Sequence, residues 1–297
     1  MVALVGATAS GKSAAAHVAA LAHGATEIVC VDAMTPYVGM DIGTAKPTRA
    51  ERDEVRYHLL DVADPCEEMT VRRFQELCDA ALGEIAARGH TALLVGGSGL
   101  YVRALVDGLE IPPEDPALRA ALLARAGEPG GAEALHAELA AADPLGASRV
   151  DVRNARRLAR AVEVVRTTGR PFSSFGAGLG SYPATDVAQL GIRFDAPRVD
   201  AAIEERFAHW LDRGLLEEVR ALAARPEGLS RTARQAAGYR QLLEHVEGTE
   251  GLDAAVAEAI AATRRLARRQ WRWFRRDPRI HWVDDAPGAS SALATLL

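Results

Sequence analysis

Apolar and polar positions along the first hundred residues alternate in blocks that predict strands and helices in turn. Short apolar runs typical of buried strands cover residues 2–5, 28–31 and 91–95. Helical patterns lie between them: one runs from Lys12 to Ala22 and ends near Gly24, and another runs from a capping Thr70 to Arg88, with Gly89 just beyond. Such alternation favours the α/β class, with a parallel sheet covered by helices on both faces.

The pattern changes after Gly108. Residues 117–168 are almost wholly helical in pattern, with breaks over 127–131 and near Asp143-Pro144, and a loop rich in Gly, Ser and Pro follows over 169–183. Strand character returns over 187–194 and 279–283, and helical patterns cover 199–224 and 232–276. We therefore expect a discontinuous core of 1–110 and 185–297, with a mainly helical insertion over 111–184.

Composition excludes several classes of protein. The 297 residues are 48% hydrophobic, which is ample for a packed core, and the net charge of −5 confines any nucleic-acid surface to a local patch. The sequence shows neither a signal peptide nor an apolar run long enough to span a membrane. None of the three cysteines forms a CxxC pair, so we expect reduced thiols in the core rather than zinc ligands or disulfides. We expect a cytoplasmic monomer.

The segment GATASGKS, from Gly6 to Ser13, predicts a phosphate-binding loop. Its glycines allow backbone N–H groups to turn towards a phosphate, Lys12 adds a compact charge, and the Ser13 hydroxyl can bind Mg²⁺. The strand before it and the helix after it are the context that this motif requires. Lys12 and Lys46 are the only lysines among 35 basic residues, which suggests sites that need an ammonium group. For Lys46, a GC-rich codon bias, which favours arginine over lysine, explains the isolated lysine equally well by chance.

An acidic residue follows only one of the predicted strands near this loop. Kinases and ATPases usually carry a metal-binding aspartate at the end of an apolar strand, but the run TALLV ends in Gly96-Gly97. The run EIVCV instead ends in Asp32. Because ligands bind at the carboxyl ends of parallel strands, Asp32 should point towards the phosphate loop, as a metal ligand or a general base. A turn or helix cap is the alternative.

The segment 261–276 has no acidic residue and places many arginines on one helical face. On a helical wheel the basic positions fall within an arc of about 140°, and they are Arg264, Arg265, Arg268, Arg269, Arg272, Arg275 and Arg276. Like charges so close repel one another, so an unpaired set favours a polyanion; pairing with acidic residues elsewhere in the chain is the alternative. A second basic face, at Arg153, Arg156, Arg157 and Arg160, fits a salt-bridged surface equally well.

These features together indicate an enzyme that acts on nucleic acid and uses a phosphorylated small molecule. A nucleotide or metabolite kinase is the alternative suggested by the phosphate loop alone. A non-catalytic RNA-binding protein is the alternative suggested by the arginines alone.

Several longer blocks resemble one enzyme family. With GATASGKS, they are VDAMTPYVGMDIGTAKP (31–47), HLLDVADP (58–65), LLVGGSGLYVRALVDGL (93–109), QAAGYRQ (235–241) and TRRLARRQWRWFR (263–275). In this order and over nearly the whole chain, they closely resemble the tRNA dimethylallyltransferases, also called tRNA isopentenyltransferases, of bacterial type. The resemblance implies a core like that of P-loop NTPases and a helical insertion that grips the anticodon stem-loop. It also implies that a dimethylallyl group passes from dimethylallyl diphosphate, with Mg²⁺, to N6 of the adenosine 3′ of the anticodon (position 37), which must be flipped out of its stack.

The resemblance also implies roles for single residues. Asp32 matches the general base, Ser98 replaces a channel-lining threonine and keeps its hydroxyl, and Lys12 would stabilise the leaving diphosphate. The donor-binding residues would be Gly6, Ala7, Thr8, Ala9, Ser10, Gly11, Lys12, Ser13 and Arg206. The tRNA-binding residues would be Asp32, Ala33, Met34, Thr35, Ser98, Arg119, Arg156, Arg157, Arg160, Gln235, Gly238, Tyr239, Arg240, Arg268, Arg269, Arg272 and Arg275. Thr35, Pro36 and Val38 depart from the usual pattern of the family.

Overall fold

The structure is a computed structural model that describes residues 1–176 and 178–297. The chain forms two compact units, one of Met1–Val106 with Ala184–Leu297 and one of Asp107–Pro183. The sequence placed these two boundaries at residues 110 and 184. The loop expected over 169–183 contains Ala177, which lies outside the described residues.

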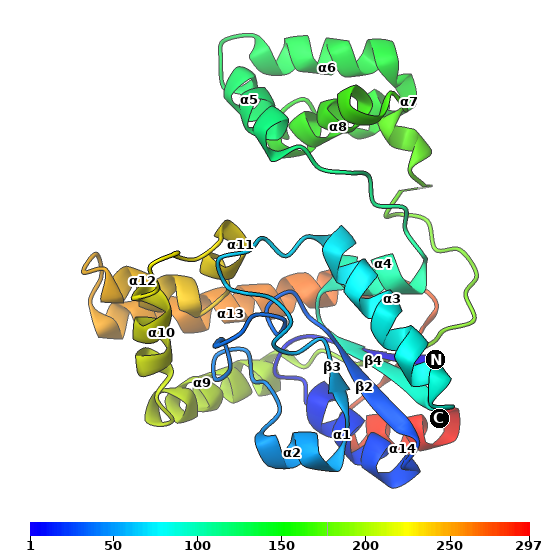
Figure 1. Cartoon of the computed structure of the whole chain (residues 1–297), viewed down its shortest axis with the longest axis vertical. Helices are drawn as coiled ribbons and strands as arrows, with labels where there is room; N and C mark the ends of the chain where they lie inside the picture. The colour runs from blue at the N-terminus through cyan, green and yellow to red at the C-terminus, as the bar shows by residue number, and fades with distance from the viewer. Residues whose placement is uncertain (177) are drawn as a thin grey trace. The chain divides into compact units, whose positions relative to one another are not determined.

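A six-stranded, fully parallel sheet organises the first unit, as the sequence predicts (Figure 1). Its strand order is β3-β2-β4-β1-β5-β6. The strands are β1 (Val2–Val5), β2 (Thr26–Val31), β3 (Tyr57–His58), β4 (Thr91–Gly96), β5 (Ala188–Ile192) and β6 (Ile280–Val283). The two-residue β3 is the one strand that the hydrophobic pattern did not predict, because it is too short to show a periodicity.

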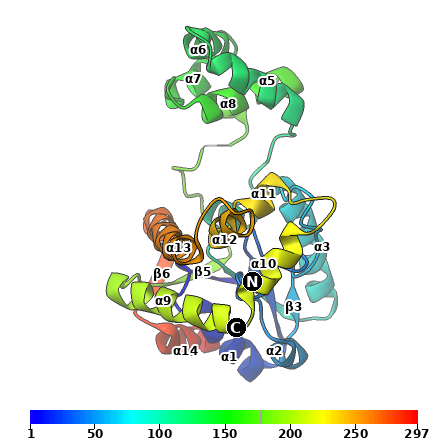
Figure 2. The same cartoon turned by 90° about the vertical axis from the view of Figure 1, so that its left-hand side faces the viewer.

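Successive side chains of the strands point to opposite faces of the sheet, and each face has its own core. Val2 and Leu4 of β1 pack with α1 (Lys12–His23) and α14 (Ala286–Leu296). Ala3 and Val5 belong to a second cluster, which includes α3 (Val71–Ala87) and α4 (Gly99–Val106). Figures 1 and 2 show these helix pairs on opposite sides of the sheet, so the carboxyl ends of β1, β2 and β4 are left as an open edge.

Helices from the second half of the chain complete the first unit. They are α9 (Ala196–Asp212), α10 (Leu215–Ala223), α11 (Arg231–Arg234), α12 (Tyr239–Val246) and α13 (Leu252–Phe274). Phe207 of α9, Leu242 of α12 and Phe274 of α13 join the same apolar cluster as α3. This packing brings α9 and α13 to the edge of the sheet where the phosphate loop lies. The short α2 (Arg49–Glu54) and the alanine-rich α14 were not predicted.

The second unit has a helical core of its own. Its helices are α5 (Pro116–Ala126), α6 (Gly131–Ala142), α7 (Pro144–Arg149) and α8 (Ala155–Thr168), with a short 3-10 turn at Phe172–Ser174. Leu122, Leu135, Leu139 and Leu158 form the centre of its apolar cluster. The predicted helix breaks are confirmed. At the second one, Asp143 accepts a hydrogen bond from Gly146 N at 2.8 Å and thus caps α7.

Candidate active site

The phosphate loop connects the central strand β1 to α1, and its backbone is bent sharply. Gly11 has a φ of 87°, and a Cβ atom there would lie 2.9 Å from Cβ of Ala286 on α14. Ala9 also has a positive φ, 62°, which costs energy in a residue with a side chain. The Ser10 Oγ is buried and has no hydrogen-bond partner within the described residues. A bound anion would accept hydrogen bonds from the backbone N–H groups of such a loop and from the unpaired Ser10 hydroxyl.

Two cations face the cavity beside this loop. Burial lowers the pKa of Lys12 to about 8; the carboxylate of Asp32 opposes this shift, and the guanidinium of Arg206 adds to it. The Lys12 ammonium donates to the Ala7 carbonyl at 3.2 Å. Burial also lowers the pKa of Arg206 to about 10. Two positive groups held partly out of water gain a great deal from an anion placed between them.

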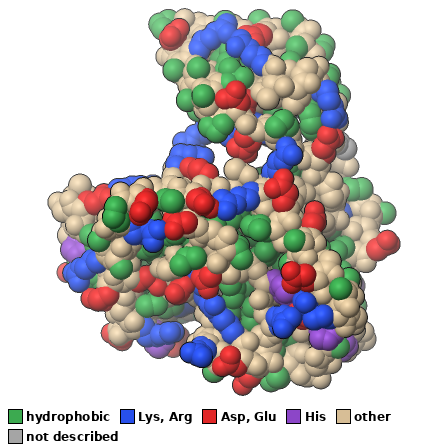
Figure 3. Space-filling model, in the orientation of Figure 1, with side chains coloured by type: hydrophobic (Ala, Val, Ile, Leu, Met, Phe, Trp, Pro, Cys, Tyr) green, Lys and Arg blue, Asp and Glu red, His purple; other side chains and the backbone are tan. Residues whose placement is uncertain are grey.

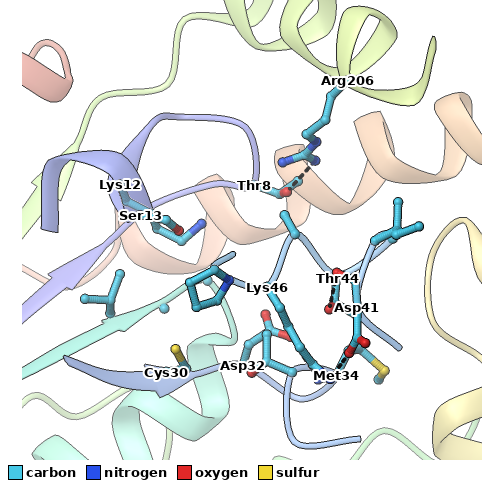
Figure 4. Close-up of a pocket in the computed structure, with 18 of the residues that line it drawn as sticks. Thr8, Lys12, Ser13, Cys30, Asp32, Met34, Asp41, Thr44, Lys46 and Arg206 are labelled. Atoms are coloured by element: carbon cyan, nitrogen blue, oxygen red, sulfur yellow. Dashed lines mark hydrogen bonds and ion pairs between the residues drawn. The ribbon is translucent and has the colours of Figure 1, made fainter. Parts of the chain in front are cut away.

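Arg206 is aimed into the cavity from α9 (Figure 4). Its Nη2 donates to Thr8 Oγ1 at 3.0 Å, and its guanidinium carbon lies 4.5 Å from the ring centroid of Trp210. Its Nε is buried and has no hydrogen-bond partner within the described residues. The sequence alone gave no signal for Arg206, which came from the family resemblance.

Asp32 follows β2 and lines the same cavity as Lys12, Ser13, Thr8 and Arg206. Its Oδ1 accepts from Met34 N at 2.8 Å, and its Oδ2 accepts from Ser98 Oγ at 3.4 Å. Ser98 Oγ in turn accepts from Ala33 N at 3.3 Å. The carboxylate is therefore oriented through both oxygens and still has lone pairs free to take a proton.

The cavity has a volume of about 800 Å³, large enough for a small phosphorylated ligand and part of a second molecule. Of the residues predicted to bind tRNA, Asp32, Met34, Thr35 and Tyr239 line it. Thr35 is 8% exposed, and its Oγ1 has no hydrogen-bond partner within the described residues. Gly238 is buried, and Gln235 and Arg240 lie at the surface.

Gly96, the last residue of β4, and Gly97, which follows it, explain why no acid stands there. A Cβ on Gly96 would lie 2.1 Å from the Val31 carbonyl, and one on Gly97 would lie 2.6 Å from Nε2 of Gln270. No side chain fits at either position without moving its neighbours, so the acid at this edge of the sheet comes from β2 instead.

Two side chains that the sequence did not place in the site hold the loop 41–47, which also lines the cavity. The Lys46 side chain is only 1% exposed, and its ammonium contacts Asp41, Asp61 and the Tyr37 carbonyl at 2.5–2.6 Å. From the other side, Glu218 of α10 accepts from the backbone N–H groups of residues 41–43 and from the hydroxyl of Tyr239. All three protons of the Lys46 ammonium are used, which explains why a lysine stands there.

The face of unpaired arginines expected on α13 is wrong for three of its members. Arg264 pairs with Asp200 and Glu204 of α9, Arg268 with Asp200 at 2.6 Å, and Arg265 with Glu258. These acids lie outside the segment 261–276 from which the prediction was made: Asp200 and Glu204 are on α9, and Glu258 lies three residues before the segment begins. Within the described residues no ion pair involves the other four, and all four are exposed: Arg269, Arg272, Arg275 and Arg276. Figure 3 accordingly shows acidic and basic side chains intermingled over this region of the core.

In the helical unit, two of the arginines predicted to bind tRNA have internal partners. Glu163 is fully buried and accepts from Arg119 Nε at 2.7 Å and from Arg160 Nη1 at 3.0 Å. Arg160 also donates to the carbonyls of Pro112 and Pro113. Arg156 and Arg157 are exposed on α8. On this helix, the predicted arginines that are exposed therefore lie in its N-terminal turn.

Three further predictions concern metals, thiols and membranes. Among the described residues, no group of three or more His, Cys, Asp or Glu side chains could hold a metal ion. The Ser13 hydroxyl lines the cavity, and Mg²⁺ typically takes few protein ligands and the rest from phosphates and water, so this donor set fits it. Cys78 is buried as expected, but Cys66 is exposed. No helix over 1–176 and 178–297 is long and apolar enough to cross a membrane.

Comparison with known proteins gives consistent results. A sequence model of the IPP transferase family matches residues 35–277. The tRNA dimethylallyltransferase of Kineococcus radiotolerans is 46% identical over 99% of this chain and 93% of its own length, and that of Salinispora arenicola is 47% identical over 96% and 82%. The solved tRNA isopentenylpyrophosphate transferase of Bacillus halodurans is 32% identical, with a TM-score of 0.70 over 99% of this chain and 94% of its own. A eukaryotic dimethylallyltransferase acting on tRNA, 21% identical, shares the fold with a TM-score of 0.77 over 96% and 73% of the two chains.

Proposed function

The chain belongs to the IPP transferase family, and on this premise we propose that it transfers a dimethylallyl group to tRNA. We further propose that the donor is dimethylallyl diphosphate and the acceptor N6 of the adenosine at position 37, 3′ of the anticodon. The observation that carries the proposal is the shared cavity: the phosphate loop, Lys12, Arg206 and the carboxylate of Asp32 all line it. Kinase activity is not favoured, because the relatives are dimethylallyltransferases and no acidic residue follows β4 as a metal ligand.

The donor end of the cavity suits the diphosphate. In this proposal the amides of the phosphate loop, the Lys12 ammonium and the Arg206 guanidinium contact its oxygens. Their positive charge stabilises the charge that grows on the diphosphate as the bond from C1 to oxygen breaks. The Ser13 hydroxyl is the protein ligand that would hold Mg²⁺, which when bound neutralises further negative charge on the diphosphate.

The acceptor end suits a flipped adenine. As N6 forms its bond to C1 of the donor, it must lose a proton, and Asp32 is the base that lines the cavity. The hydrogen bonds from Met34 N and Ser98 Oγ fix the direction of this carboxylate, so the proton has a defined acceptor. Thr35 offers an unpaired hydroxyl at the same end, which an exocyclic or ring nitrogen of the base would satisfy.

The tRNA-binding surface is proposed to lie on the exposed arginines of α13 and on Arg156 and Arg157 of α8. Arg119, Arg160 and Arg268 are supporting residues in this proposal, since their guanidinium groups already contact carboxylates. We also propose that the enzyme acts as a cytoplasmic monomer.

A direct assay tests the function. Unmodified tRNA is mixed with the protein, Mg²⁺ and labelled dimethylallyl diphosphate, with labelled ATP in a parallel tube. Label that enters tRNA from the diphosphate alone, and that digestion locates on N6 of adenosine 37, is the expected result. ATP turnover with a small acceptor would overturn the proposal in favour of a kinase.

A further inference from the structure

Gln270 is a buried polar side chain of α13 that reaches the phosphate loop. It is 9% exposed, and its Oε1 accepts from Thr8 N at 2.7 Å, across 262 positions of sequence. It also lines the cavity that holds Lys12 and Asp32. On the helical wheel it lies among the apolar residues of α13, so the sequence pattern gave it no role.

The space for Gln270 is made by the absence of a side chain at Gly97. A Cβ there would lie 2.6 Å from Nε2 of Gln270 and 3.1 Å from the carbonyl oxygen of Gly6. Gln270 is thus wedged between the phosphate loop and the end of β4. Ser98, the residue after Gly97, contacts Asp32. Gln270 therefore holds the phosphate loop by a hydrogen bond and packs against Gly97, the residue before Ser98.

Thr8 connects Gln270 to Arg206. Gln270 holds the backbone N–H of Thr8, while the Thr8 hydroxyl accepts from Arg206 Nη2 at 3.0 Å. Without Gln270, this N–H would be left without that partner in a partly buried position, and the loop would have to shift to satisfy it. A shift of Thr8 would also move the hydrogen-bond partner that helps to aim Arg206 into the cavity.

The structure assigns to Gln270 a positioning role in donor binding: it fixes Thr8, and through Thr8 the phosphate loop and Arg206. It does not touch the reacting atoms in this assignment. The inference rests on the proposed function for its kinetic consequences, but not for its effect on diphosphate binding, which is measured without tRNA.

The first experiment uses Gln270→Met, which keeps the length of the side chain and removes the acceptor. The probe is inorganic pyrophosphate with Mg²⁺, and its Kd is measured by calorimetry. We expect Kd to rise about tenfold, the lower end of the loss that metal sites show when a hydrogen-bond partner behind a ligand is removed. In the transfer assay, KM for dimethylallyl diphosphate should rise while the Kd for tRNA stays within twofold.

Gln241→Met is the matched control. Gln241 is 2% exposed, and its Oε1 accepts from the backbone N–H of Gly238 at 3.1 Å, but it does not line the cavity. Both variants should lower Tm by a similar amount, and only Gln270→Met should weaken pyrophosphate binding. Equal pyrophosphate Kd values for wild type and Gln270→Met, or equal losses in the two variants, would overturn the assignment.

Gln270→Glu is a second variant that tests the same role if Gln270→Met does not fold. The carboxylate retains an oxygen for the Thr8 N–H, so Tm should stay near that of wild type. Its charge lies beside the anion site, so pyrophosphate binding should be weaker than wild type at pH 8, and the difference should narrow as the pH falls towards about 4. A constant difference across this pH range would count against the placement of Gln270. If wild type fails to modify tRNA while these binding effects appear, the proposed function is wrong and the role of Gln270 stands.

Discussion

At the scale of single residues, the orientation of Asp32 makes a sharp prediction. Asp32→Asn leaves an amide that can still accept from Met34 N but cannot take up a proton. We expect the single-turnover rate of transfer to fall by roughly 10²–10⁴, the usual contribution of a general base, while the Kd for tRNA changes by less than a few-fold. Rapid-quench measurements with saturating tRNA and donor give the rate. Asp32→Ala should behave similarly.

Ser98→Ala is the variant with which the two Asp32 variants are compared. It removes one hydrogen bond to the Asp32 carboxylate and leaves the base itself, so its rate should lie between those of wild type and Asp32→Asn. A transfer rate for Asp32→Asn close to that of wild type would remove Asp32 as the base.

The lowered pKa of Lys12 predicts a pH dependence of donor binding. With this pKa, about half of the Lys12 ammonium groups in the free protein have lost their proton at pH 8. A bound diphosphate favours the charged form and raises this pKa, so binding takes up a proton once the pH exceeds about 8. Pyrophosphate affinity should therefore be full well below that value and decline as the pH rises through it. Calorimetry from pH 6.5 to 9.5 measures the effect.

Lys12→Met is the reference at each pH, because it removes the titrating group and leaves the titration of pyrophosphate itself unchanged. Its affinity should be lower throughout and lack the additional decline above pH 8. Lys12→Arg should not restore activity, since the loop encloses a compact ammonium rather than a planar guanidinium. A parallel pH profile for wild type and Lys12→Met would contradict the assignment of this titration to Lys12.

At the scale of elements, the buried ammonium of Lys46 holds one side of the loop 41–47. Lys46→Met leaves Asp41 and Asp61 facing each other without their shared cation. Because both carboxylates can be partly rehydrated, we expect the free energy of unfolding to fall by about 2–3 kcal/mol, somewhat less than for a fully buried pair. Denaturation in urea measures it. Arg52→Met removes a more exposed ion pair to the same Asp61 and should cost no more than about 1 kcal/mol.

Some arginines of the predicted basic face of α13 are ion-paired and others are not, and this difference also makes a prediction at this scale. Replacing Arg272 and Arg275 with alanine should lower tRNA affinity and flatten the log–log salt dependence by about 0.7–0.9 per lost phosphate contact. Replacing Arg264 and Arg268, which pair with α9, should mainly lower Tm. Three of the four residues lie in α13 and Arg275 is its C-cap, and all four substitutions remove the same group. If both double variants flatten the salt slope equally, the ion pairs with α9 open when RNA binds.

The same helix illustrates what the sequence could predict. Its basic composition is a local property, so a window of a few turns was enough to find it. Its bounds were not predicted, because the helical pattern expected over 232–276 is divided into α11, α12 and α13. The partners Asp200 and Glu204 lie some sixty residues earlier, and no local pattern connects them to Arg264 or Arg268. Asp32 and the phosphate loop were predictable because strand ends converge on one edge of a parallel sheet. Gln270, Glu218 and Lys46 act through contacts that only the folded chain brings together.

At the scale of the whole molecule, the helical unit is inserted at a single point of the core. Val106 and Thr185 flank it, and Thr185 Oγ1 donates to the Val106 carbonyl at 3.2 Å. Replacing residues 108–183 with a short Gly/Ser linker should therefore leave the sheet intact. We expect cooperative unfolding and pyrophosphate binding within a few-fold of wild type, with tRNA affinity strongly reduced. Loss of pyrophosphate binding in a folded variant would show that the unit also shapes the donor site.

The position of β1 in the sheet has a consequence for the order in which the protein comes into being. β1 is synthesised before its neighbours β4 and β5, which begin at Thr91 and Ala188, and before Ala286 of α14, which packs beside Gly11. The phosphate loop is therefore synthesised well before the segments that surround it in the fold. Such distant pairing slows folding and leaves an apolar strand edge exposed during synthesis. The surroundings of the phosphate loop are therefore complete only once Ala286 has been synthesised.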